Sequence, residues 1–263
     1  KKHLTIARLC LTIVRHFITG SKEYINDIAR YCIWLNDDNY KEAMDIPLIK
    51  KRIEKVKDFR LSSTAQSTRE AASYAYKFKQ RGHYDNVTVS KEQFNTIVVP
   101  RVSSESRIYV PFGLSNQNVI ISDSAMAIYD APLWLLGLLE SRMHMVWLEN
   151  VGGKLETRYR YSSVLVYNTF PVPELSTRRK NEIEELIGNI LDIREEEGGT
   201  LAELYGSPLA AKNPKPMNSR LLEAHKGLDK VVDRAYKSTD FKDDNERLAL
   251  LLNMYSEMVN KEG

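Results

Sequence analysis

A nearly continuous apolar segment constrains this chain more than any other part of its sequence. Residues 133–151 read LWLLGLLESRMHMVWLENV. Pro132 precedes the segment and Gly152-Gly153 follow it, which is typical of the start and end of a helix. A helix that is apolar on nearly every face has to be buried. We therefore expect one central helix in the core, opened by Pro132 and closed by the glycine pair.

The segment after the glycine pair is expected to lie at the surface. Residues 154–160 read KLETRYR and carry four charged side chains, Lys154, Glu156, Arg158 and Arg160. Side chains alternate along a strand, so an extended segment would place Glu156, Arg158 and Arg160 on one face and the Leu, Thr and Tyr residues between them on the other. The buried helix would thus hold a rigid, charged hairpin at the surface for a partner to contact.

The totals indicate an ordinary globular protein of one or two domains, because 43% of its 263 residues are hydrophobic and 28% are charged. No run of about 18 apolar residues predicts a membrane span. Cys10 and Cys32 are interpreted as buried free thiols of a reducing compartment, and a cytoplasmic location is expected. The chain begins at Lys1 with no signal peptide and with what reads as mid-domain sequence, so we expect a fragment of a longer protein.

The charge is distributed unevenly along the chain. Residues 1–173 carry 24 Lys+Arg against 17 Asp+Glu, a net charge of +7, whereas residues 174–263 carry 14 against 18, a net charge of −4. Phosphate binding is a common reason for a basic domain, although +7 over 173 residues is a mild excess.

The pattern of elements predicts an α+β fold. Short β-branched runs with short links predict a mixed or antiparallel sheet around the central helix, in a domain at residues 1–173. After Pro173 only helical patterns remain, and they predict a small helical bundle at residues 174–263. Residues 62–95 are expected to form loop and short helix. The strands are predicted at residues 31–35, 96–100, 108–112, 119–121, 125–129 and 164–167.

Pro47 is expected to open a helix of roughly 15 residues with a basic face. That face is more simply read as a solvated surface, and the alternative is a helix that contacts phosphates. Its basic residues are Lys50, Lys51, Arg52, Lys55, Lys57 and Arg60.

No catalytic motif stands out in this chain. The five histidines lack metal-ligand spacing, and neither a Gly-rich phosphate loop nor a nucleophile elbow occurs. His144 and His225 are read as packed structural histidines rather than as bases. The residues alone therefore favour a binding module over an enzyme.

Two segments carry side chains suited to nucleic acid. In the first, RVSSESRIY, hydroxyl and guanidinium groups can contact phosphates and Glu105 can orient the arginines, while an ordinary polar turn is the alternative. The candidate DNA-binding residues of this segment are Arg101, Ser103, Ser104, Arg107 and Tyr109.

The second segment is the charged hairpin, where Glu156 and Arg158 could read one G·C pair. Arginine offers two donors to guanine and glutamate accepts from the cytosine amino group, a contact worth roughly 1–3 kcal/mol against the wrong base. Lys154 and Arg160 would add DNA contacts. A surface salt bridge between Glu156 and either arginine, worth about 0–1 kcal/mol, is an equally good reading of the chemistry.

Across almost its whole length the sequence resembles the C-terminal half of the MmeI-like enzymes, single-chain type II restriction–modification proteins also filed as type IIG or IIL. The matching words include YCIWL (31–35), VPRVSSESRIYVPFG (99–113), LLGLLESRMHMVW (135–147), GGKLETRYRYS (152–162), VYNTFPVPE (166–174), LLEAHKGLDKVVDRAY (221–236) and ERLALLLNMY (246–255).

The resemblance implies that the parent protein holds a PD-ExK nuclease, a helical linker and an adenine methyltransferase ahead of a target recognition domain and a helical C-terminal domain. This chain resembles the last two and lacks the catalytic motifs, so S-adenosylmethionine and Mg²⁺ are expected only in the missing domains. The implied partners are double-stranded DNA and the methyltransferase domain of the same chain. Two positions after the Gly-Gly turn choose one base pair in the family, and here they are Glu156 and Arg158.

Three hypotheses remain open from the sequence. The first is a DNA recognition module of a restriction–modification enzyme. The second is a protein-interaction or scaffold module without base contacts, motivated by the mild charge and the acidic helices. The third and weakest is a cryptic enzyme that uses His144 with Glu140 or Glu149.

Overall fold

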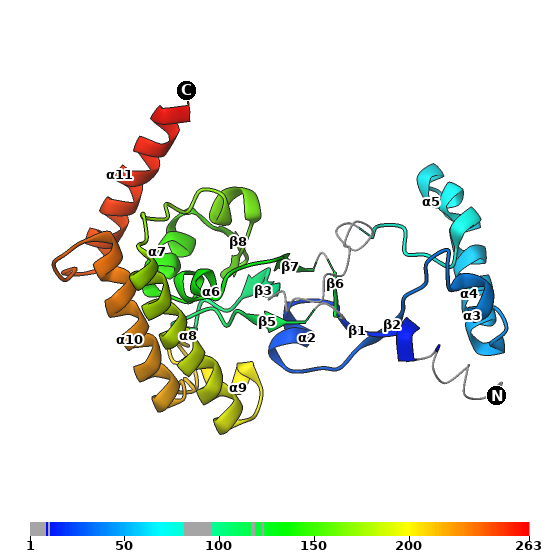
Figure 1. The fold of residues 1–263 in the computed structure, drawn as a ribbon, viewed down its shortest axis with the longest axis horizontal. Helices are drawn as coiled ribbons and strands as arrows, with labels where there is room; N and C mark the ends of the chain where they lie inside the picture. The colour runs from blue at the N-terminus through cyan, green and yellow to red at the C-terminus, as the bar shows by residue number, and fades with distance from the viewer. Residues whose placement is uncertain (1–8, 10, 82–95, 117–118, 123, 263) are drawn as a thin grey trace. The chain divides into compact units, whose positions relative to one another are not determined.

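The computed structural model describes residues 9, 11–81, 96–116, 119–122 and 124–262. The chain divides into unit 1, Lys1–Phe17 with Arg30–Glu92, and unit 2, Ile18–Ala29 with Gln93–Gly263 (Figure 1). The expectations placed on Cys10 and on residues 82–95 lie outside the described residues. Among the helices that are described, none is long and apolar enough to cross a membrane.

Unit 1 is built from a short antiparallel strand pair and several helices. Strand β1 (Val14–Ile18) pairs with β2 (Tyr31–Ile33), a shorter strand than predicted. Helix α4 (Pro47–Leu61) has 15 residues and begins at Pro47, as predicted. The other helices are α3 (Tyr40–Ala43), α5 (Gln66–Glu70) and the 3-10 turn η1 (Ala71–Tyr74).

One residue of the predicted basic face of α4 is buried instead of solvated. The Arg60 guanidinium donates to the carbonyl oxygens of Ala71 at 2.7 Å, Tyr74 at 3.2 Å and Lys77 at 2.7 Å. These carbonyls lie at the first and last residues of η1 and three residues beyond it. Arg60 therefore holds the turn after α5 to α4, and the remaining lysines and Arg52 form the exposed basic face.

Unit 2 contains two small antiparallel sheets. In the first, β3 (Thr96–Pro100) lies between β5 (Gly113–Ser115) and β7 (Ala125–Ile128). In the second, β9 (Arg158–Arg160) lies between β4 (Val102–Ser103) and β8 (Gly153–Leu155). The unit also holds helix α2 (Ser21–Ile25) and strand β6 (Ile120–Ile121). The α+β class with antiparallel pairing, predicted from short strands and short links, is confirmed.

Two predicted strands are wrong. Residues 108–112 are irregular: Tyr109, Val110 and Phe112 are apolar because they are buried, and the Phe112 N–H closes a tight turn onto the Val110 carbonyl at 3.0 Å. Residues 164–167 lie in a π-helical turn, η3 (Ser163–Tyr167), whose first turn is capped by the Ser162 side chain. In both places burial and capping outweighed β propensity.

The central apolar segment is buried as predicted, but it forms two helices. Helix α6 (Leu133–Leu139) ends at Glu140, and α7 (Arg142–Val151) begins after Ser141. The Ser141 backbone is extended and its hydroxyl accepts from the His144 N–H at 3.4 Å, which makes Ser141 the N-cap of the second helix. The prediction of one continuous helix is therefore corrected.

The helices after Pro173 pack on the same core as the central segment. They are α8 (Thr177–Glu197), α9 (Leu201–Tyr205), α10 (Ser219–Tyr236) and α11 (Asp244–Glu262), and α8 runs beside α10 (Figure 1). A Cβ added to Gly137 of α6 would lie 2.4 Å from Ile183 of α8, so this crossing requires glycine. One continuous core thus joins α6 and α7 to the C-terminal helices.

A buried ion pair lies where α6 ends. The Arg194 guanidinium donates to both Glu140 carboxylate oxygens, at 2.7 and 2.8 Å, and to the Phe112 carbonyl at 2.7 Å. The Tyr205 hydroxyl donates to Glu140 at 2.9 Å and lies 2.9 Å from His225 Nε2. Burial raises the pKa of Glu140, while the Arg194 charge opposes the shift. The network joins the α6–α7 break to α8, α9 and α10.

Replacement of Arg194 by methionine is expected to lower the free energy of unfolding by about 3–5 kcal/mol, because Glu140 is left buried without its partner. The double variant Glu140→Leu with Arg194→Met should be more stable than Arg194→Met alone. Chemical denaturation measures both. As a control, Arg220→Met removes an exposed arginine that pairs with Glu196 and Glu197 and should change stability little. Equal losses for the buried and the exposed arginine would contradict this account.

His144 is fully buried beside Tyr161, and burial lowers its pKa to about 3. In the unfolded chain the pKa is near 6.5, so only the unfolded state takes up this proton as the pH falls. Between pH 7.5 and pH 5 the wild type should lose about 2 kcal/mol relative to the His144→Phe variant. Denaturation curves of both proteins at the two pH values provide the test, and a pH-independent difference between them would refute it.

Candidate DNA interface

The charged segment after the glycine pair forms a tight hairpin. Strands β8 and β9 are joined by Glu156 and Thr157, and Leu155 lies opposite Arg158. The prediction of a single extended run over residues 155–161 is therefore corrected, because the chain reverses direction at Glu156. Glu156 adopts a φ of 58°, a left-handed conformation that costs a residue other than glycine about 1 kcal/mol. Such local cost is common where a side chain serves function.

Glu156 and Arg158 stand side by side at the surface. Arg158 Nη2 donates to Glu156 Oε2 at 2.8 Å, with 44% of the Arg158 side chain and 77% of the Glu156 side chain exposed. This is the salt bridge that the sequence left open. An exposed pair of this kind is worth about 0–1 kcal/mol, so exchanging it for contacts with bases costs little. The pair presents one acceptor group and one donor group to solvent at the hairpin tip.

The root of the hairpin is fixed to the core. Tyr161 is buried, its hydroxyl lies 2.9 Å from His144 Nε2 of α7, and its N–H donates to the Arg101 carbonyl at 2.8 Å. Arg160 is exposed and lies two residues from Arg158, on the same face of β9. Lys154 is also exposed.

The two segments chosen from the sequence lie side by side. Strand β4, with Val102 opposite Arg160 and Ser103 opposite Tyr159, continues the hairpin into one three-stranded sheet. Nothing in the local sequence predicted this pairing, since the segments are about fifty residues apart. The sheet brings the two segments together, with the candidates Ser103, Lys154, Arg158 and Arg160 on its strands.

Glu105 has a different role from the one expected of it. Instead of pairing with Arg101 or Arg107, its carboxylate accepts from the Thr157 hydroxyl at 2.7 Å. This hydrogen bond lowers the pKa of Glu105, and the charges of Arg158 and Lys154 lower it further. Glu105 therefore supports the hairpin turn.

Two predicted DNA contacts are placed in the interior. Ser103 is 5% exposed, and Tyr109 is buried, with its hydroxyl 2.6 Å from Asp229 and its ring stacked on His225. Both placements argue against contact with DNA. Ser104 is half-buried and its hydroxyl accepts from the Ser106 N–H at 3.2 Å, which shapes the turn.

The arginines of the first segment remain candidates for phosphate contact. Arg101 and Arg107 are half-buried, and neither has an ion pair among the described residues. The Nε of each is buried without a hydrogen-bond partner there. Burial also lowers the pKa of Arg107. A partly buried cation without a carboxylate gains more from an incoming anion than an exposed one does.

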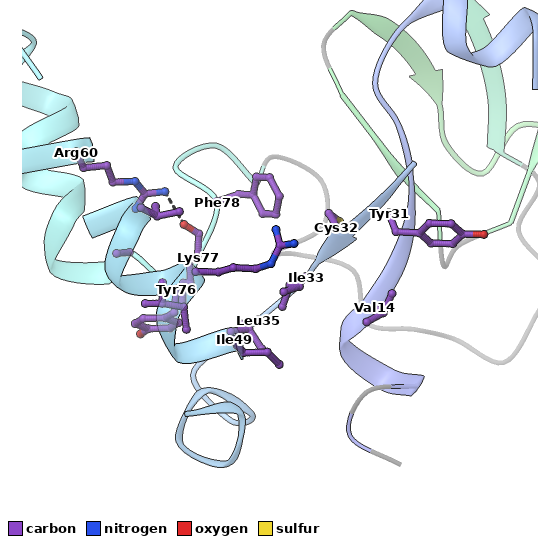
Figure 2. A pocket seen from close by; sticks show the side chains of 14 residues that line it. Val14, Tyr31, Cys32, Ile33, Leu35, Ile49, Arg60, Tyr76, Lys77 and Phe78 are labelled. Atoms are coloured by element: carbon purple, nitrogen blue, oxygen red, sulfur yellow. Dashed lines mark hydrogen bonds between the residues drawn. The ribbon is translucent and has the colours of Figure 1, made fainter. Parts of the chain in front are cut away.

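Unit 1 offers an apolar cavity of about 530 Å³. Figure 2 shows Ile33, Leu35 and Phe78 among the side chains that line it. Its thiol, Cys32, is half-buried, and burial raises the pKa of that thiol to about 11, which leaves it protonated and weakly nucleophilic. The lining brings together no nucleophile and base.

Among the residues that it describes, the structure shows no open site for the cryptic enzyme that was the third hypothesis from the sequence. His144 is fully buried, Glu140 is held by Arg194, and Glu149 forms an ion pair with Arg142 at 3.0 Å. A substrate has no access to His144 in this arrangement.

Comparison with known proteins identifies the family. Residues 8–174 match the family model "MmeI, target recognition domain" and residues 175–261 match "MmeI, C-terminal domain". The chain belongs to the MmeI family. The resemblance stated from the sequence words is confirmed.

Two relatives show how much of a larger protein the chain spans. It is 49% identical over 242 residues to DNA methyltransferase A of Bacillus subtilis (strain 168), covering 92% of this chain and 26% of that protein. It is 37% identical to the type IIL restriction-modification enzyme MmeI, solved in complex with DNA, with a TM-score of 0.82 over 98% of this chain and 33% of that chain. The chain thus spans about a quarter to a third of these relatives.

Two substitutions at Glu156 can distinguish a role of its side chain in folding from a role in reading a base, because the backbone there has a positive φ. Glu156→Asn is expected to keep or slightly raise the free energy of unfolding, because asparagine tolerates positive φ. Glu156→Val should lower it by about 1 kcal/mol or more, because a β-branched side chain is strained there. Thermal denaturation of the two variants compares them. A loss with asparagine as large as that with valine would mean that the glutamate side chain itself holds the hairpin.

Proposed function

We propose that this chain is the sequence-reading DNA module of a restriction–modification methyltransferase and endonuclease. The observation that carries the proposal is the exposed Glu156–Arg158 pair on a hairpin anchored to the core, in a chain of the MmeI family. A relative that this chain matches over 33% of that relative's length was solved in complex with DNA, which supports DNA as the partner. Double-stranded DNA is the form that we propose.

In this proposal the hairpin enters the major groove and reads one G·C pair. Arg158 donates to guanine O6 and N7, and Glu156 accepts from the cytosine N4 amino group. Their mutual ion pair opens to allow this, at a cost of about 0–1 kcal/mol. Lys154, Arg160, Arg101 and Arg107 contact phosphates, which position the protein without specifying sequence.

Chemistry on the DNA belongs to parts of the protein beyond this chain. The described residues bring together no group of three or more His, Cys, Asp or Glu side chains that could hold a metal. From the family resemblance we propose that S-adenosylmethionine and Mg²⁺ bind to other domains of the full-length protein, and we derive no catalytic step from the residues here. The methyltransferase domain of the same polypeptide is the proposed protein partner, and the cytoplasm is the proposed location.

The decisive experiment exchanges the charges of the reading pair. DNA exposed to the full-length protein with S-adenosylmethionine is sequenced for methylated adenines, for the wild type and for Glu156→Lys with Arg158→Asp. The double variant should methylate a motif that differs at one base pair. The matched control, Glu223→Lys with Lys226→Asp, makes the same exchange in an exposed ion pair on α10 and should keep the wild-type motif. An unchanged motif in the hairpin variant would remove the reading role.

A scaffold module without base contacts is the second candidate, favoured by the net charge of −4 over residues 174–263. The two candidates differ in how DNA affinity depends on salt. Neutralised phosphates release counterions, so affinity falls steeply with salt concentration when DNA is gripped by cations. DNA binding that does not change with salt would favour the scaffold.

A further inference from the structure

A loop of the C-terminal helices lies against the first DNA-binding segment. Residues 206–217 connect α9 to α10, and within this loop the Leu209 N–H donates to the Ser106 carbonyl at 3.0 Å. Ser106 is the neighbour of Arg107 and follows Glu105, which holds the hairpin turn. The loop is therefore attached to the end of the segment that runs along the reading hairpin.

The conformation of this loop is fixed by its own sequence. Ser207 and Lys215 exchange two backbone hydrogen bonds, at 2.9 and 3.3 Å, which close the loop at its base. Gly206 has a φ of 55°, and a Cβ there would lie 2.5 Å from the Lys215 carbonyl, so glycine is required. Three prolines restrict the remaining backbone. They are Pro208, Pro214 and Pro216.

The loop contributes little to the core, since Met217 is its one buried hydrophobic residue apart from the closing glycine. A defined conformation on an exposed segment is typical of loops that bind a partner.

The charge of the loop is opposite to that of the surrounding helices. Residues 206–217 contain Lys212 and Lys215 and no acidic residue, although residues 174–263 together have a net charge of −4. Both lysines are exposed, and neither has an ion pair among the described residues. Hydrogen bonds from Thr200 lower the pKa of Glu203, and the charge of Lys215 lowers it further. The negative charge of Glu203 therefore offsets part of the charge of Lys215, and Lys212 is the stronger candidate for binding an anion.

We propose that this loop, together with Arg107, forms a second contact with DNA that grips the phosphate backbone beside the reading hairpin. The proposal rests on the proposed function above and extends it, because it makes the C-terminal domain part of the DNA interface. Arg107 supplies a half-buried cation without a carboxylate partner among the described residues. The loop, which is hydrogen-bonded to the neighbouring Ser106, supplies the exposed ammonium groups of Lys212 and Lys215. Such contacts fix where the hairpin stands on the duplex and are independent of base sequence.

The test measures the salt dependence of DNA binding by the full-length protein. A 30-bp duplex of mixed sequence is the probe, since phosphate contacts need no target site. Affinity is followed by fluorescence anisotropy over a series of salt concentrations. Each lost phosphate contact should reduce the slope of log affinity against log salt by about 1. We expect this reduction for Lys212→Ala and for Arg107→Gln, and a smaller one for Lys215→Ala.

Two variants control for other effects of substitution. Lys212→Arg keeps the charge and should keep the wild-type slope. Lys230→Ala removes an exposed lysine of α10, away from the loop, and should also leave the slope unchanged. Thermal denaturation establishes that each variant is folded.

The outcomes separate this inference from the proposed function. If the wild type binds with a steep salt dependence and the Lys212→Ala with Lys215→Ala variant shows the same slope, the loop contact is overturned while DNA binding stands. If the wild type does not bind the duplex, both are overturned. If the loop variants reduce the salt slope but still methylate the wild-type DNA motif, the loop makes a phosphate contact that is separate from base reading by Glu156 and Arg158.

Discussion

The ion pair between Glu140 and Arg194 is the interaction on which the arrangement of unit 2 depends. A fully buried carboxylate is tolerable only when its charge and lone pairs are satisfied, and here Arg194 and Tyr205 satisfy them. Because Arg194 also binds the Phe112 carbonyl, the pair joins the sheet part of the unit to α8. His225 is hydrogen-bonded to the Tyr205 hydroxyl and to the Glu140 carbonyl, and so links α10 to the ion pair. The direction of the C-terminal helices is thereby set by polar geometry inside an apolar core.

From this core the support extends to the surface in a few steps. Helix α7 starts at Ser141, directly after Glu140, and carries His144, which lies against Tyr161. Tyr161 follows β9 and fixes the root of the hairpin whose tip carries Glu156 and Arg158. The base reading that we propose needs a rigid support, since a guanidinium that moves freely cannot select one base edge. The buried His144 and Tyr161 provide such a support.

The proposed interface combines exposed and half-buried charges. The exposed pair of Glu156 and Arg158 costs little to rearrange, which suits contacts that must match one base pair. The half-buried Arg101 and Arg107 have no carboxylate partner among the described residues, which suits contacts with phosphates anywhere along DNA. Glu105, which was expected to orient these arginines, accepts a hydrogen bond from Thr157 instead. The two arginines are therefore left without an ion pair among the described residues.

The sequence by itself determined the elements whose signals are local: the helix that begins at Pro47, the buried central segment, the capped helices after Pro173 and the charged pair Glu156 and Arg158. Only the tertiary structure decided the rest. The break after Glu140 depends on a partner fifty-four residues away, and the burial of Ser103 and Tyr109 depends on β9 and α10. Residues 108–112 were predicted as a strand because a run of buried apolar residues has the same sequence pattern whether or not its backbone pairs with another strand. Local propensity acts over a few residues, whereas burial and buried charge are properties of segments that meet only when the chain is folded.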